Sequence, residues 1–389
     1  MSRAAPVYLD YNATAPIRPE AHAAAVCALD IGANPSSVHA RGRMARAAVE
    51  QARREVARLV NARDEQVIFT SGGAESNRMA VEAAVAGGCR RPIVLMTEHD
   101  SVMRPASSSG QWVEAWPVSD QGVARVDWLA ERLQRWDKAD GAPFVAVALA
   151  NSETGVIQPV AEIAALVHAA GGALHVDAVQ AAGKIPLDMA ALGADTLTLS
   201  AHKLGGPQGS GALVLGPHAP LRARRAFALG HALSPGQEQG LRTGTENVSG
   251  IAGFGAAATA ALRDLPRAGD QAAWRDVAAE RLKAEGAVIA GEGAARLPGV
   301  LCAVTDGFPS ELQVMMLDLD GVMVSAGSAC SSGKVQASGV LLAMGLAGVL
   351  ASSAVRASGG WATTEADWIR FADAWAAACQ RHAQRKAVA

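Results

Sequence analysis

The stretch TLTLSAHKLGGPQGSGALVL, Thr196 to Leu215, decides how the rest of the chain is interpreted. Its first five residues are apolar and β-branched, which predicts a short buried strand. Lys203 follows this strand, just before a glycine-rich turn and a second apolar run from Gly211. A lysine at the end of a buried strand is costly unless its amine is paired, solvated or used covalently. Two interpretations stay open: the amine extends to solvent, or it has the lowered pKa that a Schiff-base lysine needs.

Composition limits the class of protein. The 389 residues are 50% hydrophobic and 19% charged, as in a globular protein with room for two domains. The net charge of -2 gives no reason to expect nucleic acid or an anionic membrane as a partner. The N-terminal residues lack the apolar core of a signal peptide, and no apolar run is long enough for a membrane span. We therefore expect a cytoplasmic protein without membrane contact.

The cysteines are odd in number, widely scattered and without CxxC spacing. This pattern argues against a disulfide framework or a zinc site and favours a reducing compartment, so we expect no metal. The five positions are Cys27, Cys89, Cys302, Cys330 and Cys379.

Predicted strands alternate with predicted helices from Gln66 to Leu215. That alternation is typical of an α/β protein with a mostly parallel sheet covered on both faces. A polar motif follows each strand, at the carboxyl ends where such sheets bind ligands. One of these motifs, SGGAES after the strand QVIFT, is a glycine turn before a helix, which can bind a phosphate through backbone N–H groups.

A second strand end supplies a carboxylate. The run ALHVD ends at Asp177, and Gln180 follows three residues later. A lysine and an aspartate at two strand ends are the pair that a pyridoxal 5'-phosphate (PLP) site requires. The lysine holds the aldehyde as an imine, and the aspartate keeps the ring nitrogen protonated so that the ring accepts electrons.

From YLDYNATAP near the start to TTEAD near the end, the sequence resembles the cysteine desulfurases, PLP enzymes of the class V aminotransferase type. SAGSAC, residues 325–330, is the most specific single string for that family. The resemblance implies the PLP-dependent transferase fold type I. A large domain, residues 16–257, would hold a mostly parallel seven-stranded sheet, and residues 1–15 and 258–389 would form a smaller α+β domain with a mobile cysteine loop.

The resemblance also implies a role for each site residue. Lys203 would bind PLP, His99 would lie against its ring, and either could take the substrate's α-proton. Arg356 would clamp the substrate carboxylate. The remaining implied contacts are Asp177 to the ring nitrogen, Gln180 to the ring oxygen, Asn151 to cofactor and substrate, and Gly73, Ala74, Ser200, His202 and the partner subunit's Thr245 to the phosphate.

The implied reaction converts L-cysteine to L-alanine in a homodimer. Cys330 lies among glycines and serines, where a thiol can move and be exposed as a nucleophile must be. As a thiolate it would attack the substrate sulfur and carry it as a persulfide to an acceptor, such as an iron–sulfur scaffold or a sulfur carrier protein.

Four positions depart from the family pattern. Ala74 stands where threonine is common, Asp100 is unexpected after His99, and Ala337 and Gly339 replace an expected proline and histidine. Three alternatives remain: a selenocysteine lyase, another class V enzyme such as an aminotransferase, or a non-catalytic sulfur-relay scaffold. An aminotransferase needs no thiol on a flexible loop, which argues against that alternative.

Overall fold

The computed structural model describes residues 5–108, 110–216, 237–327 and 337–388. Its largest sheet has seven strands in the order β2-β8-β7-β6-β5-β3-β4. All neighbours in this sheet are parallel except β8, which runs antiparallel to β2 and β7. The strands are β2 (Val67–Thr70), β3 (Ile93–Leu95), β4 (Glu114–Trp116), β5 (Phe144–Ala148), β6 (Ala173–Asp177), β7 (Thr196–Ser200) and β8 (Gly211–Leu215). The predicted α/β fold with a mostly parallel sheet is confirmed.

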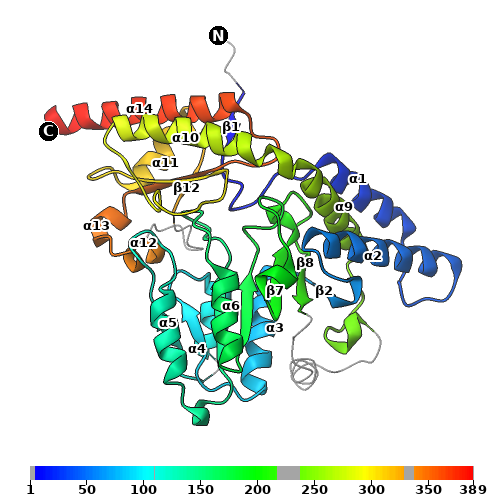
Figure 1. The fold of residues 1–389 in the computed structure, drawn as a ribbon. Coiled ribbons are helices and arrows are strands. Elements are labelled where there is room, and N and C mark those ends of the chain that lie inside the picture. Colours follow the sequence, from blue (N-terminus) through cyan, green and yellow to red (C-terminus); the bar gives the residue numbers. More distant parts are fainter. Residues whose placement is uncertain (1–4, 109, 217–236, 328–336, 389) are drawn as a thin grey trace.

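Helices cover both faces of this sheet, which explains why its strands are apolar runs without alternation. Within β3, Val94 packs toward α3 and α4, whereas Ile93 and Leu95 belong to the core on the opposite face. Figure 1 shows the sheet enclosed in this way. The helices of this part are α1 (Pro19–Ile31), α2 (Ala40–Leu59), α3 (Gly73–Ala86), α4 (Asp100–Ser108), α5 (Val126–Gln134), α6 (Val160–Ala169), α7 (Met189–Leu192) and α9 (Val248–Asp264).

A second, antiparallel sheet has its own core. Its order is β12-β13-β10-β9, and α10 and α14 pack beside each other over it (Figure 1). Trp368, Phe371 and Trp375 of α14 are fully buried in this core. The elements are α10 (Ala268–Ala284), β9 (Val288–Ile289), β10 (Val300–Val304), α11 (Ser310–Leu319), β12 (Ser325–Ala326), α12 (Gly339–Ala343), α13 (Gly348–Ala351), β13 (Ala354–Ser358) and α14 (Glu365–Val388).

The N-terminal arm joins this second part. Strand β1 (Val7–Tyr8) pairs in parallel with β11 (Val322–Met323), and Leu9 is buried in the core of α14. The predicted division after residue 257 falls inside α9, which continues to Asp264. Among the residues that the structure describes, no helix is both long and apolar enough to cross a membrane.

A buried carboxylate protects the outer edge of β2. Glu238 accepts hydrogen bonds from both terminal nitrogens of Arg53 on α2, at 2.8 and 2.9 Å. It also accepts the backbone N–H of Phe69, at 2.7 Å. The Arg53 guanidinium lies over the Phe69 ring, 4.8 Å from its centroid. Glu238 therefore ties its own turn to α2 and satisfies a donor that an edge strand would otherwise leave unpaired.

We expect Glu238→Ala to lower the free energy of unfolding by about 3–5 kcal/mol, because it leaves a buried guanidinium without its buried counter-charge. Urea denaturation measures this change. Glu50→Ala is the matched control, since Glu50 contacts the same Arg53 at 3.1 Å but is 39% exposed. The control should cost about 0–1 kcal/mol. Equal losses in the two variants would contradict a special role for Glu238.

Candidate active site

A cavity of about 270 Å³ opens at the carboxyl ends of the parallel strands. Eight of the predicted site residues line it, and they come from strand ends that are far apart in the sequence. These are Gly73, Ala74, His99, Asp177, Gln180, Ser200, His202 and Lys203. The cavity is therefore the place where the sequence motifs converge.

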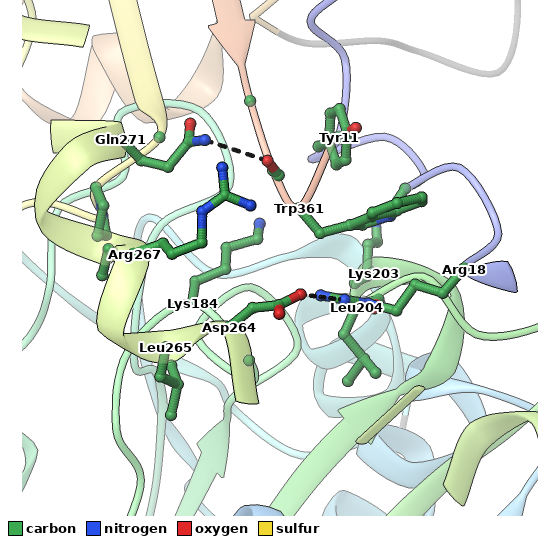
Figure 2. A pocket seen from close by; sticks show the side chains of 17 residues that line it. Tyr11, Arg18, Lys184, Lys203, Leu204, Asp264, Leu265, Arg267, Gln271 and Trp361 are labelled. Carbon is green, nitrogen blue, oxygen red and sulfur yellow. Dashed lines mark hydrogen bonds and ion pairs between the residues drawn. The ribbon is translucent and has the colours of Figure 1, made fainter. Parts of the chain in front are cut away.

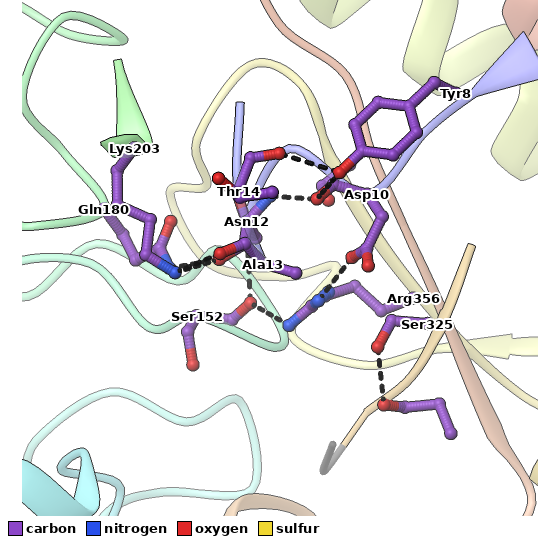
Figure 3. A network of polar contacts seen from close by, with 12 residues as sticks. Tyr8, Asp10, Asn12, Ala13, Thr14, Ser152, Gln180, Lys203, Ser325 and Arg356 are labelled. Atoms are coloured by element: carbon purple, nitrogen blue, oxygen red, sulfur yellow. Dashed lines mark hydrogen bonds and ion pairs between the residues drawn. The ribbon is translucent and has the colours of Figure 1, made fainter. Parts of the chain in front are cut away.

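Lys203 lies at the end of the short 3-10 turn η3 (Ala201–Lys203) that follows β7. Its amine donates to the backbone carbonyls of Asn12, at 2.5 Å, and Ala13, at 2.9 Å (Figure 3). Burial, with the positive charge of Arg356, lowers the pKa of Lys203 to about 8, against the opposing charges of Asp177 and Asp10. The amine is thus held by neutral oxygens, and about a tenth of it is uncharged at pH 7, far more than for an ordinary lysine.

Asp177 ends β6 and faces the same cavity. One carboxylate oxygen accepts the N–H of Val179 at 2.9 Å, and the other accepts the amide of Asn77 at 2.7 Å. Each oxygen keeps a free lone pair for a further donor. Burial, together with the Asp177 charge, raises the pKa of the neighbouring Glu98 carboxyl well above its ordinary value. The uncharged form of Glu98 is thereby favoured beside Asp177.

Gln180 is held by two residues that sequence reasoning missed. Its amide nitrogen donates to Asn12 O at 3.0 Å, and its oxygen accepts from Lys184 at 3.0 Å. Lys184 also donates to the Asn12 side chain at 2.6 Å. The strings YLDYNATAP and QAAGK contain these residues, but only the fold brings Asn12 beside Lys184.

A second, smaller cavity lies behind Lys203 and meets the first at that residue. Figure 2 shows Lys184 and Arg267 pointing into it, with Trp361 at one wall. Arg18 stacks on Trp361 and pairs with Asp264. Burial, with the charges of Lys203 and Arg356, lowers the pKa of Lys184 to about 7.

The N-terminus of α3 forms a cradle with backbone N–H groups. Glycine is required there, because a Cβ on Gly73 would lie 2.8 Å from the Val179 side chain. A shallow extension of the cavity along this cradle is also lined by Ser200 and His202. Burial lowers the pKa of His202 to about 4, and its ring contacts Thr14 at 3.1 Å. A neutral donor set at a helix N-terminus fits a phosphate group.

Arg356, on β13, is 5% exposed and does not line the cavity. One terminal nitrogen contacts Asp10 at 2.7 Å, and the other donates to Ser152 O at 3.2 Å (Figure 3). Its Nε has no hydrogen-bond partner among the described residues. The Asp10 carboxylate therefore holds the guanidinium beside the Ser152 turn, which does line the cavity.

Besides Arg356, two described residues of the predicted site, Asn151 and Thr245, do not line this cavity. Asn151 bonds to Thr97 O, and its oxygen accepts from Glu153 N and Thr154 N, so its amide stabilises the turn after β5. Thr245 is exposed. Cys330 lies outside the described residues. The proposed contacts of these three residues stay predictions.

Two departures from the family pattern have local explanations. The carboxylate of Asp100 forms an ion pair with Arg104 on the surface of α4, at 2.8 Å. Asp100 therefore pairs with Arg104 and not with His99. Gly339 begins α12, whose cap Ser338 bonds to Leu341 N and to the buried carboxylate of Glu153 at 2.5 Å.

The described cysteines differ in reactivity. Burial raises the pKa of Cys302 to about 12 and also raises the pKa of Cys89 and Cys379. These three thiols are poor sources of a thiolate. Cys27 is exposed on α1.

Comparisons with known proteins identify the family of this chain. The model of the aminotransferase class-V family matches residues 7–371. A cysteine desulfurase of Cereibacter sphaeroides is 38% identical, with 94% of this chain and 93% of the relative covered. A cysteine desulfurase IscS of Dictyoglomus turgidum is 34% identical, with 93% and 91% covered. The crystal structure of a NifS-like protein from Rickettsia africae matches with a TM-score of 0.85 at 28% identity, covering 96% of this chain and 99% of that one. The chain therefore belongs to the cysteine desulfurases of the aminotransferase class-V family.

Proposed function

We propose that this protein is a PLP-dependent cysteine desulfurase that converts L-cysteine to L-alanine. The observation that carries the proposal is the convergence of Lys203, Asp177 and the α3 N-terminus on one cavity. An uncharged amine, a carboxylate and an anion cradle are the three groups that PLP needs. The relatives are named for the same activity.

The cavity residues have distinct cofactor contacts in this proposal. Lys203 would bond covalently to the aldehyde, Asp177 would accept the ring N–H, and Gln180 would contact the ring oxygen with its remaining amide hydrogen. When bound, PLP stabilises negative charge at the substrate's α-carbon. Gly73, Ala74, Ser200 and His202 would hold the phosphate, together with Thr245 of the partner subunit.

Besides the group that removes the α-proton, two residues of this chain act on the substrate. Arg356 binds the carboxylate of the substrate cysteine. This carboxylate either displaces Asp10 from the guanidinium or binds beside Asp10 at Nε, which has no hydrogen-bond partner among the described residues. The Cys330 thiolate attacks the substrate sulfur, so that an S–S bond forms while the substrate's C–S bond breaks. The electron pair of that bond stays with the substrate carbon, which is protonated to give alanine. Sulfur remains on Cys330 for transfer to an acceptor protein, such as an iron–sulfur scaffold or a sulfur carrier.

The proposal extends to the assembly and to the alternatives. The protein is a cytoplasmic homodimer in which Thr245 of each chain completes the other cavity. The large domain comprises residues 16–257, and residues 1–15 with 258–389 form the small one.

A selenocysteine lyase would use the same cavity. Comparing kcat/KM of this protein for cysteine and for selenocysteine tests which substrate it prefers. An aminotransferase or a scaffold is distinguished by the Cys330 variant below.

The lowered pKa of Lys203 predicts how cofactor attachment depends on pH. We expect the rate of PLP capture by the apoprotein to rise about tenfold per pH unit at low pH, because only the uncharged amine attacks an aldehyde. The rate should flatten above a pH of about 8, whereas an ordinary lysine would keep accelerating toward its unperturbed pKa. Borohydride trapping followed by peptide mapping measures this. A label on Lys184, or a rate that still rises steeply at high pH, would overturn the assignment.

Replacing Arg356 by alanine should raise KM for cysteine and leave the resting absorbance of the bound cofactor unchanged. Loss of a charge-assisted pair costs about 1.5–3 kcal/mol, or roughly one to two decades in kcat/KM. Because this change leaves Asp10 unpaired, the double variant Arg356→Ala/Asp10→Asn is the control for folding. A wild-type kcat/KM in both variants would remove Arg356 from the substrate site.

Cys330→Ser should retain PLP and bind cysteine, but it should release no sulfide, because a serine hydroxyl is a poor nucleophile toward sulfur. Intact mass after cysteine is added without reductant should show one extra sulfur on the wild-type Cys330 peptide and none in the variant. Cys27→Ser, at an exposed thiol, is the matched control and should behave as wild type. If the protein were an aminotransferase, the Cys330→Ser variant would keep its activity. If it were a non-catalytic scaffold, the wild-type protein would show no activity either. Extra sulfur on Cys27 would refute the proposed nucleophile.

A further inference from the structure

A chain of hydrogen bonds links the carboxylate of Asp177 to the imidazole of His99 through two residues without an assigned role. Asn77 Nδ2 contacts Asp177 Oδ2 at 2.7 Å and Ser101 Oγ at 2.8 Å. Ser101 Oγ then contacts His99 Nδ1 at 2.8 Å. Asp177 and His99 line the same cavity, with Asn77 and Ser101 between them. The direction of each hydrogen bond in this chain follows from the chemistry of its ends.

At the Asp177 end the direction is fixed because a carboxylate only accepts. The atom of Asn77 that faces Asp177 must therefore be the amide nitrogen. Its two hydrogens are then used, one for Asp177 and one for Ser101 Oγ. The amide oxygen of Asn77 is left to face His175 Nε2, at 3.0 Å.

His175 is compatible with this orientation of Asn77. Its ring is fully buried, and burial lowers its pKa to about 3, so the ring is neutral and carries a single proton. That proton lies on Nε2, where Asn77 accepts it, and Nδ1 accepts from the Thr196 hydroxyl at 2.9 Å. Both ring nitrogens of His175 are then satisfied, in agreement with the Asn77 orientation that the Asp177 carboxylate fixes.

At the other end two donors converge on His99 Nδ1. Ser101 Oγ already accepts from Asn77, so its own hydrogen is available to His99. The backbone N–H of Ser101 also donates to His99 Nδ1, at 3.1 Å. An N–H always donates, so Nδ1 must present a lone pair. In the neutral ring the proton therefore lies on Nε2, which has no hydrogen-bond partner among the residues that the structure describes.

We propose that Asn77 and Ser101 are positioning residues that fix His99 in the Nε2–H tautomer, so that His99 offers the cavity a hydrogen-bond donor and not a base. The role of His99 toward cofactor and substrate rests on the proposed function, whereas the tautomer rests on the hydrogen bonds alone. Of the two candidates for removing the substrate's α-proton, only Lys203 then has an available lone pair.

The tautomer is measured by ¹⁵N NMR of the full-length protein labelled in histidine, both without and with PLP. His99→Gln identifies the His99 signals by their loss. We expect a protonated Nε2 and an unprotonated Nδ1 in wild type. A His99 proton on Nδ1 in the wild-type protein would overturn the proposal, whether or not the protein turns over cysteine.

Ser101→Asp should shift the tautomer equilibrium of His99. Its carboxylate can still accept from Asn77 but cannot donate to His99, so only the backbone N–H of residue 101 still favours a lone pair on Nδ1, and the Nδ1–H tautomer should gain population. Unchanged His99 signals in a folded Ser101→Asp protein would refute the role of the Ser101 hydroxyl. If this variant does not fold, the wild-type spectrum still decides the tautomer.

Ser101→Ala separates positioning from general stability. Loss of one neutral hydrogen bond should lower kcat by about 2- to 10-fold with the PLP content unchanged. Ser108→Ala is the matched control, since Ser108 is an exposed serine at the far end of the same helix. Equal kcat values in the two alanine variants would contradict the positioning role. If the wild-type protein has no desulfurase activity, the proposed function is refuted, but the NMR result on the His99 tautomer is unaffected.

Discussion

The site depends on which groups accept hydrogen bonds from the Lys203 amine. It lies at the end of a fully buried strand, yet its hydrogen-bond partners are two backbone carbonyls, Asn12 O and Ala13 O. A nearby acid bonded to it would have stabilised the ammonium form; carbonyls satisfy the N–H groups without adding a charge. The N-terminal arm therefore does more than cover the cavity. It makes the Lys203 amine compatible with burial, and it also positions Gln180 through Asn12.

Sequence patterns predicted the strands and their ends well, because a buried parallel strand is an unbroken apolar run. TLTLS and ALHVD became β7 and β6 over the predicted residues. From those ends it followed that Lys203 and Asp177 share one edge of the sheet. Local chemistry was sufficient here, since each motif directly follows its own strand.

Contacts between distant segments could not be predicted in the same way. Asp10 and Arg356 are 346 residues apart, and nothing in either string indicates that they pair. Asn77 and Ser101 each lie on a helix face, and only the packing of α3 on α4 brings them together. Asn151 has the residue type expected for a ligand contact, but its amide is used by its own turn. Composition and periodicity contain no information about such competition among neighbours.

Two segments 346 residues apart meet at this site. The backbone of Tyr11 bonds to Ser358 O, and Asn12 N bonds to the Ser358 side chain, next to the Arg356 that pairs with Asp10. During synthesis on a ribosome, the segment that supplies the partners of Lys203 is made well before the strand that supports it. Until β13 has emerged, the nascent polypeptide contains Lys203 but lacks the strand that holds its acceptors in place. The surroundings of Lys203 are therefore completed only after β13 has been made.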